Sequence, residues 1–184
     1  MKRPEWAVFG GSFDPPHAAH VLAAAYVLAA HGIARVLVTP TAAHAFGKRL
    51  SSFDDRLRMC ELAFAPLRDV ELCAIERTLP QPNYTLTTLQ ALAERYPDVQ
   101  LRLVLGTDLR AETHAWHDFD SICALAPPLW VARQGHEVER GEPALPEISS
   151  TEIRRRVLAG EPTIGLLSPA VADYIREHGL YRSS

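Results

Sequence analysis

Short apolar runs alternate with longer helix-favouring segments along most of the chain. Runs such as WAVF at residues 6–9 and ARVLVT at 34–39 are apolar and end at glycine or proline, which is typical of buried strands. The segment 20–30 is instead rich in alanine and leucine, and Gly32 follows it as a stop signal, so it indicates a helix. On these criteria we expect strands at residues 6–9, 34–39, 70–75, 101–105 and 129–132, and helices at residues 20–30, 52–64, 85–96 and 116–125.

This alternation predicts an α/β fold with a doubly wound parallel sheet that helices cover on both faces. In such sheets, ligands bind beyond the carboxyl ends of the strands. We therefore expect the chemistry at three junctions, where a predicted strand runs into glycine or polar residues. These junctions are Gly10-Gly11-Ser12, residues 39–48 and Gly106-Thr107-Asp108.

The C-terminal part of the chain is predicted to be helical. The stretch Ser149-Ser150-Thr151-Glu152 matches a capping box and opens a helix at about residues 150–159. Ser168-Pro169 opens a final helix, and Gly179 lies past its end. The polar residues 134–146 form a loop before these helices. We expect one domain over residues 1–184, with its helical part at about 148–184.

Composition excludes several classes of protein. The formal net charge of −3 over 184 residues argues against a general nucleic-acid binder, which needs a basic face. The three cysteines are scattered and form no CxxC pair, so neither a zinc site nor a disulfide framework is indicated. No targeting segment is visible, and the longest apolar run, at 21–30, is too short for a bilayer, which needs about 20 residues. We expect a cytoplasmic protein.

The strongest chemical signal is the segment 10–20, GGSFDPPHAAH, between the first predicted strand and helix. Gly10 and Gly11 allow the backbone to approach a ligand closely. His17 and His20 lie three positions apart, on one face at the start of a helix, where free amides and imidazoles suit phosphate oxygens. Two alternatives are a tight turn with exposed histidines and a metal site in which Asp14 is a third ligand.

This segment resembles the signature of the HxGH nucleotidyltransferase superfamily, and the whole chain resembles the bacterial nicotinate mononucleotide adenylyltransferases. Four further stretches are similar to motifs of that family: ISSTEIR at 148–154, LGTD at 105–108 followed by Trp116, NYT at 83–85, and YIREHGLY at 174–181. The chain departs from the family in two places. Ala19 stands where glycine is usual. The acceptor loop of the family reads PPHK, whereas here three residues separate His44 from Lys48.

The resemblance implies a Rossmann-like nucleotidyltransferase fold and transfer of AMP from ATP to nicotinate mononucleotide, with release of pyrophosphate, in NAD biosynthesis. It implies Mg²⁺ bound with ATP, mostly through phosphates and water, and no metal site of the protein's own. It implies catalytic roles for His17, His20 and Arg154. ATP would also be bound by Gly10, Gly11, Ser12, Phe13, Gly106, Asp108, Ser149, Ser150 and Thr151, and the acceptor by His44, Lys48, Asn83, Tyr84, Thr85 and Trp116.

Some of these residues have structural alternatives. Asp108 suits a ribose contact or a helix cap, and Trp116 suits stacking on a pyridine ring or packing in the core. Neighbours on a helix point about 100° apart, so Arg155 and Arg156 are assigned to a solvated face.

Two rival functions remain open. One is an adenylyltransferase with another acceptor, such as nicotinamide mononucleotide, phosphopantetheine or flavin mononucleotide. The other is a non-catalytic nucleotide-binding module, which Ala19 favours. Within the first reading we expect the acid form of the pyridine nucleotide to be preferred, because backbone amides before a helix suit a carboxylate. The number of subunits is left open.

Overall fold

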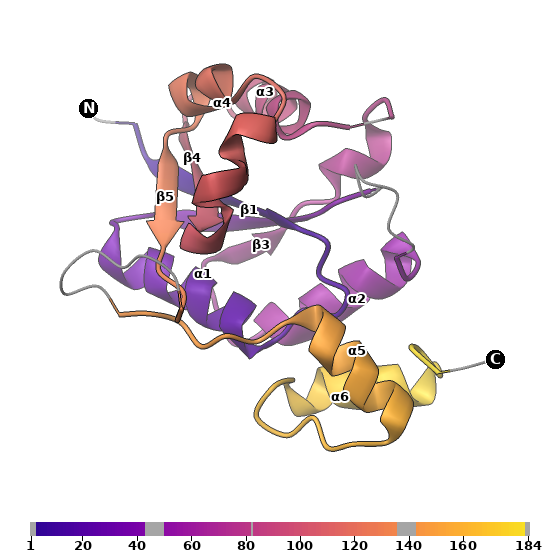
Figure 1. The fold of residues 1–184 in the computed structure, drawn as a ribbon. Coiled ribbons are helices and arrows are strands. Elements are labelled where there is room, and N and C mark those ends of the chain that lie inside the picture. The colour runs from indigo at the N-terminus through magenta and orange to yellow at the C-terminus, as the bar shows by residue number, and fades with distance from the viewer. Residues whose placement is uncertain (1–2, 43–49, 82, 136–142, 183–184) are drawn as a thin grey trace.

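The structure is a computed structural model that describes residues 3–42, 50–81, 83–135 and 143–182. Strands and helices alternate as the sequence predicts (Figure 1). The strands are β1 (Glu5–Gly11), β2 (Arg35–Pro40), β3 (Val70–Leu72), β4 (Gln100–Gly106) and β5 (Pro128–Val131). The α-helices are α1 (Ala18–Ala30), α2 (Phe53–Phe64), α3 (Thr85–Arg95), α4 (Phe119–Leu125), α5 (Ser150–Ala159) and α6 (Pro169–Glu177), and two 3₁₀ helices are η1 (Ile75–Thr78) and η2 (Thr107–Ala115).

The five strands form one parallel sheet in the order β3-β2-β1-β4-β5. Because the chain starts in the middle and proceeds first to one edge and then to the other, the sheet is doubly wound, and the predicted fold class is confirmed. The strand order reverses next to β1, so β1 and β4 diverge at their carboxyl ends and open a crevice there.

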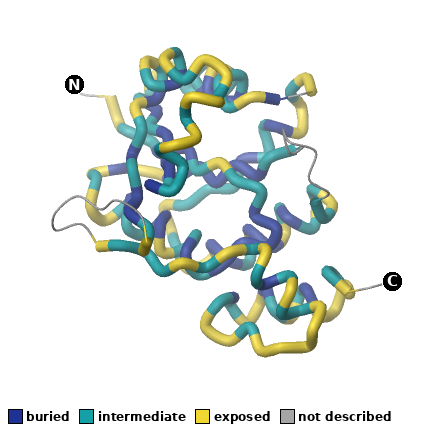
Figure 2. The backbone as a smooth tube through the Cα atoms, viewed as in Figure 1, coloured by how far each residue is buried: buried dark blue, intermediate teal, exposed yellow. Residues whose placement is uncertain are grey.

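Each face of the sheet has its own apolar core. On one face, α1, α2 and α6 pack over residues that include Ala7, Val36 and Val38. On the other face, α3 and α4 pack over residues that include Val8, Leu37 and Leu103. Buried positions accordingly follow both sides of the central strands, whereas the helices are exposed on their outer sides (Figure 2).

The C-terminal helices α5 and α6 lie beside α2, outside the layer of the sheet (Figure 1). Both start as predicted. The side chain of Ser149 accepts from the amide of Glu152, and that of Ser168 accepts from the amide of Val171. Val171 and Ile175 bury one side of α6 in the core. Gly179 takes a left-handed φ of 61° just past this helix, which glycine does at low cost.

The structure corrects two predicted elements. The strand predicted at 70–75 ends at Leu72. Cys73 still donates to the carbonyl of Val38, but the chain then turns into η1. The helix predicted from Trp116 begins only at Phe119, because Asp118 takes a left-handed φ of 50° and its carboxylate caps the amide of Ser121. The N-cap residue Asp118 therefore marks the start of this helix, and the apolar pattern alone did not reveal it.

Candidate active site

A cavity of about 1060 Å³ opens at the carboxyl ends of the strands. Its wall comes from the β1–α1 junction, the end of β4 and start of η2, the end of β5, and the residues before α3. Eleven of the residues predicted to bind substrates line it: Gly10, Gly11, Ser12, His17, His20, Asn83, Tyr84, Thr85, Gly106, Asp108 and Trp116. His44 and Lys48 lie outside the described residues. Ala19 also lines the cavity, so its methyl group belongs to the wall.

His17 and His20 form a stacked pair at the N-terminus of α1. Their rings lie 3.7 Å apart at an angle of 24°. His17 is the N-cap residue and is 4% exposed, so the alternative of two exposed histidines in a turn is wrong. The amide of His17 donates to Nδ1 of His20 at 3.2 Å. Since Nδ1 accepts, the proton of a neutral His20 ring lies on Nε2, which is then a donor.

Both imidazoles are held neutral. Burial, together with the nearby positive charge of Arg133, lowers the pKa of His17 to about 4. Burial also lowers the pKa of His20 well below its usual value, and His17 and Arg133 add to this effect. At neutral pH the pair therefore offers hydrogen bonds rather than positive charge. The Nδ1 atom of His17 is buried and has no hydrogen-bond partner in the described part of the chain.

The buried ring of Phe13 packs against the ring of His20. Phe13 is 1% exposed, adopts a left-handed φ of 47°, and its ring meets that of His20 edge-on at 4.9 Å. A Cβ added at Gly11 would lie only 3.2 Å from the same ring. The second glycine of the signature therefore leaves room for Phe13. The cavity lining does not include Phe13, so its predicted contact with ATP stays a prediction.

The backbone of the signature loop is held from behind. The carbonyl of Ser12 accepts from Arg56 at 2.9 Å, that of Asp14 from Arg154 at 2.6 Å, and that of Pro15 from the hydroxyl of Ser150 at 2.9 Å. Because three side-chain donors hold three backbone carbonyls within four residues of this loop, the histidines that follow are preorganised.

The carboxylate of Asp14 joins this support. Its Oδ1 accepts from the hydroxyl of Tyr181 at 2.6 Å, and its Oδ2 accepts from the amide of Ser51 at 3.2 Å. Both carboxylate oxygens of Asp14 therefore accept hydrogen bonds from the protein. This argues against the alternative that Asp14 ligates a metal together with the histidines. Within the described residues, no group of three or more His, Cys, Asp or Glu side chains could hold a metal ion.

The second motif lies at the start of α5 and outside the lining of the large cavity. Ser149 caps the helix, Thr151 is exposed, and Arg154 contacts both the hydroxyl of Thr151 and the loop carbonyl of Asp14. Their predicted contacts with phosphate stay predictions. In this structure, Ser150 and Arg154 serve the signature loop.

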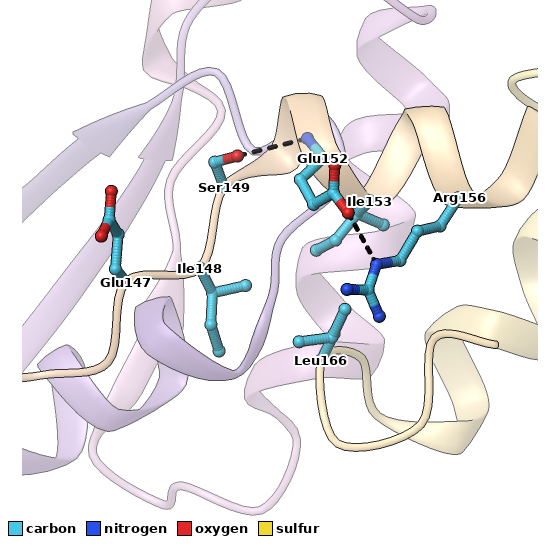
Figure 3. Close-up of a pocket in the computed structure, with 7 residues that line it drawn as sticks. All are labelled: Glu147, Ile148, Ser149, Glu152, Ile153, Arg156 and Leu166. Carbon is cyan, nitrogen blue, oxygen red and sulfur yellow. Dashed lines mark hydrogen bonds and ion pairs between the residues drawn. The ribbon is translucent and has the colours of Figure 1, made fainter. Parts of the chain in front are cut away.

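The opposite side of α5 is held by ion pairs. Arg155 pairs with Glu152 and Glu161, and Arg156 pairs with Glu152 at 2.8 Å. Figure 3 shows Arg156 reaching Glu152 over a small side cavity of about 270 Å³. Only Arg154 of the three arginines turns toward the signature loop, as the spacing of residues on a helix predicts.

The segment after β5 contains a residue that the sequence analysis missed. Arg133 lies two positions beyond the end of β5 and lines the cavity. It donates to Asp108 Oδ2 at 2.9 Å and to the carbonyl of Ile148 at 3.0 Å. It is the one lysine or arginine on this lining within the described residues. Its position at the carboxyl end of a predicted strand was the available signal.

Asp108 is not the helix cap that one alternative assigned to it. No side chain caps η2, and Asp108 lies inside its first turn. One carboxylate oxygen pairs with Arg133, while Oδ1 is buried and has no partner in the described segments. A Cβ at Gly106 would lie 2.2 Å from that oxygen, so only glycine leaves room for the carboxylate.

The residues predicted to bind the acceptor bring aromatic rings to the cavity lining. Trp116 is partly exposed and meets Phe119 edge-on at 6.0 Å, so it is not a fully buried core residue. Tyr84 is 42% exposed and packs against the ring of His117 at 4.7 Å. The partly exposed faces of Trp116 and Tyr84 suit the stacking of a flat ring. His117 and the buried Glu76 also line the cavity, and the sequence reasoning missed both.

The sequence of this chain is similar to those of known proteins. A family model described as cytidylyltransferase-like matches residues 8–156. A probable nicotinate-nucleotide adenylyltransferase of Anaeromyxobacter sp. (strain K) is 47% identical over 181 residues, which cover 97% of each chain. The nicotinate-nucleotide adenylyltransferase of Bacillus subtilis (strain 168) is 34% identical over 184 residues, covering 96% of this chain and 97% of that protein.

The fold is shared with solved structures. The nicotinic acid mononucleotide adenylyltransferase of Plasmodium falciparum, complexed with NaAD, aligns with a TM-score of 0.82 at 18% identity over 97% of each chain. A putative nicotinate-nucleotide adenylyltransferase from Vibrio parahaemolyticus aligns with a TM-score of 0.77 at 20% identity, covering 98% of this chain and 97% of that chain. At sequence identities this low, the structural similarity shows a shared fold and no more.

The fold and the histidine pair at its crevice thus define a nucleotidyltransferase of the cytidylyltransferase-like class. Within that class, the chain belongs to the nicotinate-nucleotide adenylyltransferase family. Of the helices that the structure describes, none is both long and apolar enough to cross a membrane.

Proposed function

We propose that this protein transfers AMP from ATP to nicotinate mononucleotide. A phosphate oxygen of the mononucleotide attacks the α-phosphorus of ATP, the bond from that phosphorus to the bridging oxygen breaks, and pyrophosphate leaves with the bond's electrons. The product is nicotinate adenine dinucleotide. The single observation that carries this proposal is the stacked pair His17 and His20 on the wall of a large cavity at the switch point of the sheet.

The reaction needs positioning and charge stabilisation more than it needs a base, because the attacking phosphate is already an anion. Neutral His17 and His20 supply directed N–H donors to the oxygens around the α-phosphorus. Burial and the positive charge of Arg133 lower the pKa of both rings, and the negative charge of a bound triphosphate would raise it. Proton uptake by the pair would then accompany ATP binding.

Cations of the chain neutralise the remaining phosphate charge. Arg133 lines the cavity, and it lies close enough to His17 for its positive charge to lower the pKa of that ring. Arg154 and the start of α5, with Ser149, Ser150 and Thr151, would bind the outer phosphates after Arg154 leaves the carbonyl of Asp14. Gly10, Gly11, Ser12, Phe13, Gly106 and Asp108 complete the proposed ATP site.

The proposed acceptor site uses Asn83, Tyr84, Thr85 and Trp116, with His44 and Lys48 for its phosphate. The amides before α3 lie at the positive end of a helix dipole and favour a ring carboxylate over a carboxamide. Magnesium is proposed to arrive on the phosphates of ATP, where its charge stabilises the leaving pyrophosphate. Oδ1 of Asp108 is a buried carboxylate oxygen on this lining that has no partner among the described residues. We further propose that residues 1–184 act as one cytoplasmic domain.

A pyrophosphate-release assay tests the function. ATP is offered with nicotinate mononucleotide, nicotinamide mononucleotide, phosphopantetheine or flavin mononucleotide, with and without Mg²⁺. We expect turnover with the first acceptor, a higher kcat/KM for it than for its amide, and dependence on the divalent ion. A preference for any other acceptor would contradict the substrate.

The assay also separates the enzyme from a nucleotide-binding module. The buried methyl group of Ala19 on the cavity wall is the observation that favours a module, since it narrows the approach to α1. Binding of ATP in calorimetry, together with no pyrophosphate release for any acceptor, would support the module. An Ala19→Gly variant that gained turnover under those conditions would show that the methyl group is the cause.

A further inference from the structure

Glu76 is a buried carboxylate on the wall of the cavity, at its acceptor end. Its side chain is 8% exposed and comes from η1, the turn that replaces the end of the predicted third strand. Its Oε2 accepts from the amide of Ala42 at 2.9 Å, and its Oε1 accepts from the hydroxyl of Thr88 at 3.0 Å. One side chain therefore joins the chain after β2 to the first turn of α3.

The hydrogen bonds around Thr88 determine how the side chain of Asn83 is turned. A threonine hydroxyl has one proton, and the carboxylate of Glu76 at 3.0 Å is a stronger acceptor for it than the carbonyl of Tyr84 at 3.5 Å. The oxygen of Thr88 is then left to accept, and it does so from Nδ2 of Asn83 at 3.0 Å. The amide oxygen Oδ1 of Asn83 must point the other way.

That oxygen lacks a partner. Oδ1 of Asn83 is buried and accepts no hydrogen bond in the part of the chain that the structure describes, although the residue lines the cavity and is only 9% exposed. A buried acceptor without a donor costs about 1–3 kcal/mol. Such a group is common where a ligand supplies the missing partner.

The proposed acceptor substrate limits what that partner can be. Nicotinate mononucleotide carries a carboxylate on its ring and a phosphate at its other end, and both groups accept hydrogen bonds. Its only strong donors are the two hydroxyls of its ribose.

We propose that Oδ1 of Asn83 accepts a hydrogen bond from a ribose hydroxyl of the acceptor mononucleotide, and that Glu76 and Thr88 are positioning residues that turn it toward this hydroxyl. This inference rests on the proposed function and extends it to the sugar of the acceptor.

Steady-state kinetics with deoxy analogues test the proposal. The wild-type protein is assayed with nicotinate mononucleotide and with its 2′-deoxy and 3′-deoxy forms at saturating ATP. We expect one analogue to lose about tenfold to hundredfold in kcat/KM. Asn83→Ala should remove this discrimination. The discrimination is measured as the ratio of kcat/KM for nicotinate mononucleotide to kcat/KM for the deoxy analogue. Thr88→Val keeps the shape of the side chain but loses the hydroxyl, and it should reduce this ratio to about two or less. Thr88→Ser keeps the hydroxyl and should retain the wild-type ratio.

Two readouts separate positioning from a merely structural role. The KM for ATP should stay within about twofold in all three variants, because the network touches only the acceptor end. Circular dichroism with thermal melting identifies any variant that fails to fold, and Asn83→Ala then decides the matter without Thr88→Val. The inference would be overturned, and the proposed function left intact, if the wild type used both deoxy analogues as efficiently as nicotinate mononucleotide. An unchanged ratio in Asn83→Ala would have the same consequence.

The proposed function fails in a different way. No turnover with nicotinate mononucleotide, or a preference for nicotinamide mononucleotide, would remove the substrate on which the inference rests. In the second case the carboxamide N–H is a further donor, so wild-type discrimination against the deoxy forms would be lost. Both results count against the ribose contact.

Discussion

The two ends of the cavity are built in different ways. At the proposed ATP end, the loop of residues 12–18 is held through its backbone carbonyls by Arg56 from α2 and by Ser150 and Arg154 from α5. At the proposed acceptor end, the contacts join side chains to one another, from Glu76 through Thr88 to Asn83, and the exposed ring of Tyr84 packs beside that of His117. A reaction centre that must hold an α-phosphorus in line benefits from a fixed backbone, whereas a site that selects one of several mononucleotides is set by individual side chains.

This contrast predicts that changes at the ATP end reduce turnover, whereas changes at the acceptor end alter selectivity. The largest effect is expected at the histidine pair. His17→Ala and His20→Ala should each lower kcat by about two to three orders of magnitude, the usual cost of losing a preorganised donor. Single-turnover pyrophosphate release measures this. Near-normal turnover in a folded variant would show that its histidine does not stabilise the transition state.

Arg154→Ala is expected to have the next largest effect. It removes the donor to the carbonyl of Asp14 and a cation at the start of α5. We expect a loss of about tenfold to hundredfold in kcat/KM for ATP. Arg155→Ala is the matched control, because Arg155 is exposed and pairs only with Glu152 and Glu161 among the described residues, and such surface pairs contribute little. Equal losses in the two variants would mean that the direction of Arg154 is unimportant.

A smaller effect is expected from Gly106→Ala. The new Cβ would lie 2.2 Å from Asp108 Oδ1 and 3.2 Å from Arg133, so this ion pair must shift. We expect the KM for ATP to rise by about tenfold and the melting temperature to fall. Gly10→Ala serves as the control for stability, since nothing lies within 4 Å of its Cβ position. An unchanged KM in Gly106→Ala would show that the pair does not shape the ATP site.

The last prediction concerns stability rather than turnover, and it depends on pH. In the folded protein the pKa of His17 lies at about 4, below the value of about 6.5 for an unfolded chain. The unfolded state therefore binds more protons between these values, so the contribution of His17 to stability is complete above pH 6.5 and is lost as the pH falls to about 4. The full shift corresponds to roughly 3 kcal/mol in the free energy of unfolding.

Denaturant unfolding between pH 7 and pH 4 measures this loss in the absence of nucleotide. His17→Gln removes the titrating group and should weaken the pH dependence of the unfolding free energy in this window. If wild type and variant have parallel stability profiles, His17 is not held neutral by the fold. Titration of the His17 ring by NMR should in addition show a higher pKa in the presence of ATP.

Much of the architecture could be predicted because it depends on local signals. Apolar runs ending at Gly10, Pro40 and Gly106 identified the central strands, and Ser149 and Ser168 identified the caps of the last two helices. The prediction was wrong where a short-range pattern was ambiguous. The strand predicted to reach Ile75 ends early in a 3₁₀ turn, and the helix predicted from Trp116 starts at Phe119. Boundaries like these depend on caps and tertiary contacts more than on apolar periodicity.

The fold class, the family, and the presence of His17 and His20 at the start of a helix could be predicted from residue types a few positions apart. The strand order, and the way in which distant groups meet, became known from the folded structure. There, Arg133 after β5 faces Asp108 after β4, Arg154 reaches the loop of Asp14, and Glu76 orients Asn83 through Thr88. Each of these contacts joins segments whose separation along the chain carries no local signal, so burial and hydrogen bonding in the folded protein select the partners.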